Sequence, residues 1–198
     1  MEEDRILIGL DLSLASPLAI ELLLEDASDS SLYEEIVKAN MQRPEILQLV
    51  LNSPDVPDET RQQVAKVLSM PVIPKAEILK EKTPPEVRVQ TIFQRIQKLK
   101  VSERIQLALK GGKEIRTILL KDANREVSLT VLDNPKITDT EIELIARSRS
   151  LPDEMLRIVA KRKEWLKNYG IMHALATNPK TPIGTALSFI THLKTRDL

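Results

Sequence analysis

Apolar residues recur along this chain at helical spacing, as in Ile142, Ile145 and Ala146, and no long stretch alternates between apolar and polar residues. Runs of β-branched residues are also short in this chain, so they do not predict strands. Gly111-Gly112 and Gly170 are predicted to stop or break helices. The pattern predicts an all-α protein with about nine to eleven helices, most of about 9–14 residues, joined by connections of about 2–5 residues.

Proline marks the predicted helix starts. At the first helical position its missing N–H costs nothing, and its fixed φ already suits the helix. The dipeptides that carry this signal are Ser16-Pro17, Arg43-Pro44, Val56-Pro57, Thr83-Pro84, Leu151-Pro152 and Thr181-Pro182.

A repeated turn is the most specific feature of the sequence. The segment around Asn134-Pro135 returns around Asn178-Pro179, 179 − 135 = 44 residues later, and a looser copy surrounds Ser53-Pro54. The helix after each turn has apolar residues at matched offsets, namely Val64-Ala65, Ile145-Ala146 and Phe189-Ile190. A helical period of roughly 40 residues predicts antiparallel helix pairs stacked side by side, because one pair cannot bury both of its apolar faces. We therefore expect a right-handed α-solenoid with HEAT-like repeats.

The Asn-Pro turns and helix pairs resemble HEAT-like and armadillo-like α-solenoids, including the variant leucine-rich-repeat proteins of bacteria. Residues 101–198 are also similar to an uncharacterised family of bacterial helical-repeat proteins. Three segments carry this likeness: residues 104–111, residues 118–122 and Glu164-Trp165. The resemblance implies the solenoid fold and names no activity.

Charge divides the chain into two parts. Residues 1–60 carry 14 Asp/Glu and 3 Lys/Arg, whereas residues 61–198 carry 15 Asp/Glu and 26 Lys/Arg. Prolines and charges interrupt the repeat rhythm in residues 71–86. We expect an acidic N-terminal helical part (1–70), a Pro-rich charged linker (71–86) and a basic C-terminal helical-repeat part (87–198). No polar capping repeat follows the last predicted helix, so we expect a partner or additional chain to cover that end.

Composition argues against several kinds of chemistry. The chain has no cysteine, which excludes disulfides and Cys-ligated metals, and its two histidines, His173 and His192, cannot form a His-rich metal site. Sequential carboxylates such as Asp58-Glu59 and Asp153-Glu154 do not face one another on a helix, so we interpret them as helix-start charges. The surroundings of His173 favour packing over catalysis. We expect a non-enzyme without a cofactor and, because no apolar run reaches the ~18 residues of a membrane span, a cytoplasmic protein.

One cluster of basic residues is the candidate binding site. It consists of Arg147, Arg149, Arg157, Lys161, Arg162, Lys163 and Lys167, with the chain's single tryptophan, Trp165, beside them. If the predicted helices stack, several of these cations line one surface that could bind phosphates or acidic protein. The alternative is ordinary solvated charge. For Trp165 the alternatives are a binding anchor and, more commonly in helical repeats, core packing.

These features favour a protein-interaction scaffold that binds a protein or peptide on a curved helical surface. The alternative is nucleic-acid binding by the basic half, against which the 3% of aromatic residues counts. A third hypothesis pairs the two oppositely charged halves, within one chain or between copies.

Overall fold

The computed structural model describes residues 11–71 and 85–194, apart from the side chains of residues 85–87. These described residues form thirteen α-helices and two short 3-10 helices. An isolated antiparallel bridge between Ala27 and Gly111 is the β-structure found in the same residues. The all-α prediction is confirmed. The expected helix number was too low because some helices are very short, with seven residues in Lys113–Leu119, six in Arg125–Thr130 and four in Lys163–Leu166.

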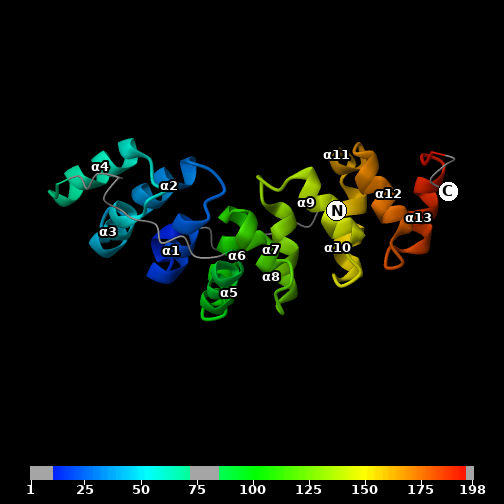
Figure 1. Cartoon of the computed structure of the whole chain (residues 1–198), viewed down its shortest axis with the longest axis horizontal. Helices are drawn as coiled ribbons and strands as arrows, with labels where there is room; N and C mark the ends of the chain where they lie inside the picture. Colours follow the sequence, from blue (N-terminus) through cyan, green and yellow to red (C-terminus); the bar gives the residue numbers. More distant parts are fainter. Residues whose placement is uncertain (1–10, 72–84, 195–198) are drawn as a thin grey trace. The chain divides into compact units, whose positions relative to one another are not determined.

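The chain forms two compact units, residues 1–136 and 137–198. The elements of the first unit, labelled in Figure 1, are η1 (Leu12–Leu14), α1 (Pro17–Glu25), α2 (Ser31–Ala39), α3 (Pro44–Asn52), α4 (Asp58–Leu68), α5 (Pro85–Ile96), α6 (Val101–Lys110), α7 (Lys113–Leu119), α8 (Arg125–Thr130) and η3 (Val131–Asp133). Those of the second unit are α9 (Asp139–Arg147), α10 (Asp153–Lys161), α11 (Lys163–Leu166), α12 (Tyr169–Thr177) and α13 (Ile183–Ile190).

Prolines begin several helices as the sequence predicts, and polar caps begin others. Pro17 and Pro44 occupy first helical positions, and the Ser16 hydroxyl accepts a hydrogen bond from the backbone N–H of Ala19. Thr138 and Glu141 form a reciprocal capping box at the start of α9. These local devices satisfy N–H groups that have no partner inside the helix.

The prediction that Gly170 breaks a helix is wrong. The helix α12 begins at Tyr169 and continues through Gly170, whose N–H is capped by the Asn168 side chain at 2.9 Å. A Cβ at Gly170 would lie 2.9 Å from the Cδ atom of Glu143 on α9. This glycine therefore permits close packing of α12 against α9 and does not end a helix.

Ion pairs connect the acidic N-terminal helices to the cationic helices that follow them within the first unit. Arg95 on α5 contacts Glu21 and Glu25 on α1, at 2.9 and 2.8 Å. Lys110 on α6 pairs with Glu35 on α2. Residues 11–68 and 85–136 thus belong to one unit, and part of the charge asymmetry is neutralised inside it. The predicted linker, residues 71–86, falls almost entirely outside the described residues.

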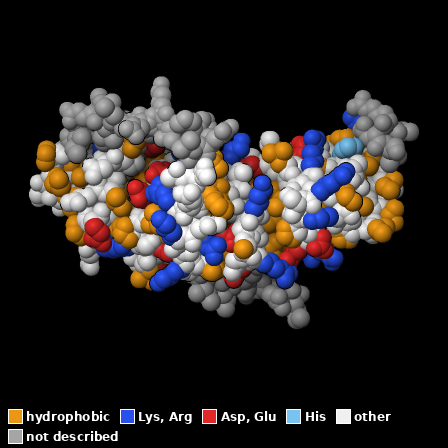
Figure 2. Space-filling view, turned by 60° about the horizontal axis from the view of Figure 1, so that its bottom comes forward, with side chains coloured by type: hydrophobic (Ala, Val, Ile, Leu, Met, Phe, Trp, Pro, Cys, Tyr) orange, Lys and Arg blue, Asp and Glu red, His pale blue; other side chains and the backbone are white. Residues whose placement is uncertain are grey.

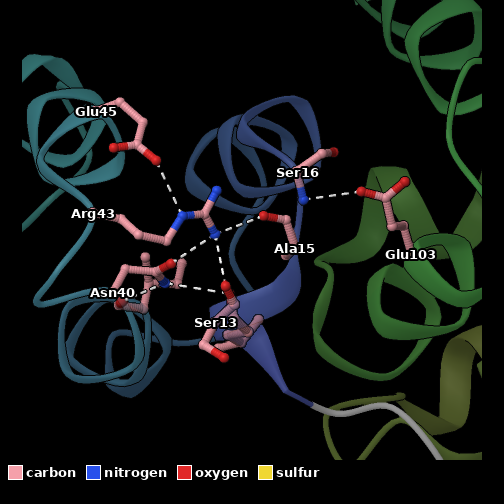
Figure 3. Close-up of polar contacts among 9 residues, drawn as sticks. Ser13, Ala15, Ser16, Asn40, Arg43, Glu45 and Glu103 are labelled. Carbon is pink, nitrogen blue, oxygen red and sulfur yellow. Dashed lines mark hydrogen bonds and ion pairs between the residues drawn. The ribbon is translucent and has the colours of Figure 1, made fainter.

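Figure 3 shows how polar side chains hold the segment before α1. Arg43 Nη1 donates hydrogen bonds to the carbonyl oxygens of Ser13 and Ala15, both at 2.8 Å. On the other side, the backbone N–H of Ser16 donates to Glu103 on α6 at 3.0 Å. Buried backbone groups need such partners. The cluster therefore fixes the start of α1 between α3 and α6.

The two clear copies of the Asn-Pro turn have the same hydrogen bonds. Asn134 donates from Nδ2 to the carbonyls of Ala108 and Gly111, at 2.9 and 3.1 Å. Asn178 donates to the carbonyls of Ala146 and Ser148, at 2.7 and 3.0 Å. Both carbonyl pairs lie at the C-terminal end of a neighbouring helix, α6 or α9, where intrahelical partners are missing. Each buried asparagine therefore connects two helices as well as ending one.

Candidate functional site

Among the described residues, no group of three or more His, Cys, Asp or Glu side chains lies close enough to hold a metal ion. Within the same ranges, no helix is long and apolar enough to cross a bilayer. The ring of His173 stacks on Tyr169 with centroids 6.3 Å apart, and His192 is exposed.

Asp26 is a half-buried acid whose pKa is shifted in the way that functional acids often show. Burial is the main cause that raises its pKa, while a hydrogen bond from the Ile115 N–H and the nearby Arg116 charge oppose that rise. Asp26 Oδ2 accepts the Ile115 N–H at 2.8 Å, and the Asp26 carbonyl accepts the Gly112 N–H at 2.6 Å. The carboxylate thus caps the start of α7, and a structural role accounts for it.

The predicted basic cluster is divided along α10. Arg147 ends α9, where it pairs with Glu143 one turn earlier at 2.5 Å, and Arg149 is exposed in the following loop. Lys161 lies at the far end of α10, eight residues after Asp153, which is about 12 Å along a helix. The structure therefore does not show Arg147 and Arg149 converging with the cations that end α10.

Four exposed cations flank the α10–α11 junction in two pairs. Arg157 and Lys161 share the exposed face of α10, opposite its buried residues Met155, Leu156 and Val159. Lys163 and Lys167 are likewise exposed and four residues apart. Arg157 pairs with the exposed Asp153 at 3.2 Å, whereas Lys161, Lys163 and Lys167 make no ion pair within the described residues. We call Arg157, Lys161, Lys163 and Lys167 the cationic edge.

Trp165 on α11 is buried, although its neighbours in sequence belong to this edge. Only 7% of its surface is exposed, and the guanidinium of Arg162 lies 4.5 Å from the centroid of its ring. A cation over an indole face is a favourable contact in its own right. Packing inside the second unit accounts for both residues, so Trp165 is not an exposed binding anchor.

The charged surface is mixed in sign. On the face drawn in Figure 2, basic side chains lie among acidic and hydrophobic ones and form no continuous field. Residues 137–198 contain ten Lys/Arg and seven Asp/Glu, a balance of +3. The cationic edge is therefore a local feature.

An exposed apolar stripe on α13 was missed by the sequence analysis. Ile183, Leu187 and Ile190 are 78%, 58% and 40% exposed, whereas Phe189 is 7% exposed. Ile190 had been expected to match the buried Ala146. In Figure 2 hydrophobic side chains gather at the right, where α13 lies in Figure 1. The sequence did contain a sign of this stripe. Ile183 and Leu187 lie 44 residues after Asp139 and Glu143, so two acidic positions of the repeat are replaced by aliphatic ones.

Comparison with protein-family models, with curated proteins and with solved structures finds no match to this chain.

Proposed function

We propose that this chain is a non-catalytic helical-repeat protein that binds an acidic segment of a partner protein at the cationic edge. The observation that carries the proposal is the exposure of Lys161, Lys163 and Lys167 without an ion-pair partner in the described residues. Cations so placed lose no existing ion pair when a carboxylate approaches.

Two similar Asn-Pro turns support a repeat architecture. Asn134 and Asn178, 178 − 134 = 44 residues apart, both have an extended backbone and are buried. They make matching hydrogen bonds, and each leads into a helix of eight or nine residues. Recurrence of one such unit favours a right-handed α-solenoid of the HEAT-like kind. Such folds present extended surfaces for protein partners.

A protein partner fits the cationic edge better than nucleic acid does. Single-stranded nucleic acid is usually held by aromatic side chains on which bases stack, in addition to cations. The aromatic residue closest in sequence to the edge, Trp165, is 7% exposed and its ring is covered by Arg162.

The test compares two triple charge reversals in the full chain. One variant carries Lys161→Glu, Lys163→Glu and Lys167→Glu in the cationic edge. The matched control carries Lys98→Glu, Lys113→Glu and Lys121→Glu, three exposed lysines of the first unit that likewise make no ion pair within the described residues. Both variants change the net charge by the same amount.

Fluorescence anisotropy would measure binding of a labelled 20-residue polyglutamate peptide and of single-stranded DNA of matched length, at low and moderate salt. We expect peptide binding that the cationic-edge variant loses by at least about tenfold and the control variant keeps. Equal losses in the two variants, or tighter binding of DNA than of the peptide, would refute the proposal.

A further inference from the structure

The apolar stripe of α13 corresponds to a face of α9 that contacts other elements of the same unit, with Asp139 exposed, Glu143 half-buried and Ala146 buried. On α9, Asp139 accepts a hydrogen bond from Asn168 at 3.3 Å, and the Glu143 carboxylate packs against Gly170. Ala146 is fully buried, and its carbonyl accepts the Asn178 amide. These three positions of α9, 139, 143 and 146, therefore face α12 and the residues that flank it.

The equivalent positions of α13 lie 44 residues later and are Ile183, Leu187 and Ile190. They occupy the same helical face but are exposed among the described residues. Two positions that are acidic on α9 have become aliphatic on α13. Large aliphatic side chains gain nothing from exposure to water, and an exposed row of them typically marks a packing surface. A helix laid across α13 as α12 lies across α9 would bury Ile190, cover much of Leu187 and contact Ile183 at its edge.

The composition of α13 favours α13 of a second copy of the chain as this second helix. Residues 181–193 carry no Asp, Glu, Lys or Arg, so two such helices can pack together without opposing like charges or burying an unpaired one. In an antiparallel arrangement, Ile183 of each copy would lie beside Ile190 of the other, and Leu187 would lie near the twofold axis. The stripe is therefore self-complementary, as a twofold interface requires.

Small residues beside the stripe favour a close approach of the two helices. A Cβ added to Gly184 would meet no atom within 4 Å, and Ser188, one turn later, is exposed. Small side chains let helix axes come near the short end of the usual 8–10 Å separation. We infer that the chain forms a homodimer through antiparallel packing of α13 on α13 of a second copy.

The expected dimer is weak, because one eight-residue helix offers less than the about 800 Å² per partner that a standard interface buries. Sedimentation velocity over about 1–500 µM should show a monomer–dimer equilibrium in the micromolar range. The substitution Leu187→Glu should weaken the dimer by at least about tenfold. The matched control is Leu144→Glu, since Leu144 on α9 is 62% exposed but lies outside the stripe.

A disulfide assay tests the twofold geometry directly, because the chain has no cysteine. Under mild oxidation, Leu187→Cys should form a covalent dimer at least about tenfold faster than Leu144→Cys, since only paired helices bring two Cα atoms within about 7 Å. A chain that stays monomeric at the highest concentration overturns the inference, and so does equally fast cross-linking of the two variants. The far-ultraviolet circular dichroism of each variant serves as the folding control.

Discussion

Removing the amide of Asn178 should destabilise the second unit by about 2–4 kcal/mol. The side chain is 6% exposed and donates to the carbonyls of Ala146 and Ser148, while its Oδ1 accepts the Lys180 N–H at 3.0 Å. Each hydrogen bond contributes about 0.5–1.5 kcal/mol, and a buried carbonyl left without a donor costs about 1–3 kcal/mol. The substitution Asn178→Ala removes all three bonds and leaves the end of α9 without its cap.

The near-isosteric substitution Asn178→Asp separates the two roles of this side chain. It keeps the acceptor for the Lys180 N–H but turns a second oxygen toward the Ala146 and Ser148 carbonyls. That environment disfavours the charged form, so the carboxyl pKa in the folded state should rise above the unfolded value of about 3.9. The loss of stability relative to the natural chain is then largest at neutral pH. It shrinks as the pH falls through the raised pKa, because a protonated carboxyl can donate again.

Urea unfolding followed by tryptophan fluorescence measures this effect in the correct unit, since the single tryptophan, Trp165, is buried in the second unit. Circular dichroism at 222 nm follows the helices of both units and shows whether they unfold separately. The equivalent substitution Asn134→Ala should act on the first unit and leave the tryptophan transition in place. A loss below about 0.5 kcal/mol for Asn178→Ala, or an Asn178→Asp variant as stable as the natural chain at pH 7, would refute this account.

Three further outcomes follow from local geometry. Gly112→Ala should lower the free energy of unfolding by more than about 1 kcal/mol, because the new Cβ would lie 2.2 Å from a carboxylate oxygen. Its control, Gly184→Ala, meets no atom and should raise that free energy by up to about 1 kcal/mol, since alanine favours helix; both are measured by urea unfolding. The pKa of Asp29 is lowered to about 2, and the hydrogen bond from the Ser31 hydroxyl is the largest cause. The ionised carboxylate therefore stabilises the fold above about pH 4, and this contribution disappears as the pH falls toward 2. Thermal unfolding of Asp29→Asn should therefore differ from the natural chain at pH 7 and converge with it near pH 2. Arg61 is fully buried and donates to the Ser53 carbonyl at 2.6 Å. Arg61→Ala should therefore lower the free energy of unfolding by about 3–5 kcal/mol in the same urea assay. Arg61→Met keeps most of the side-chain volume and should lower it less.

Part of the candidate surface was visible in the sequence. The four residues of the cationic edge were among the seven cations that had been grouped by their closeness in the chain, and residues four apart share a helix face wherever that helix lies. The sequence did not show which of these side chains are buried. Trp165 was named beside the cations, yet the fold placed it in the core under Arg162. The α13 stripe went unnoticed because its aliphatic residues match core residues in composition, and only neighbouring helices decide whether such a face is covered.

Local sequence was sufficient to predict the all-helical class, the proline starts and the position of the Asn-Pro turns, and it also accounts for the Thr138–Glu141 capping box. Each of these depends on groups within about four residues of one another, so local chemistry is sufficient. Only the tertiary structure shows that Asn178 donates to α9 and that Glu143 packs against Gly170. It also shows that Arg95 pairs with two acids about 70 residues earlier in the chain. Those contacts join segments far apart in the chain, and their partners are chosen by packing, which sequence spacing does not encode.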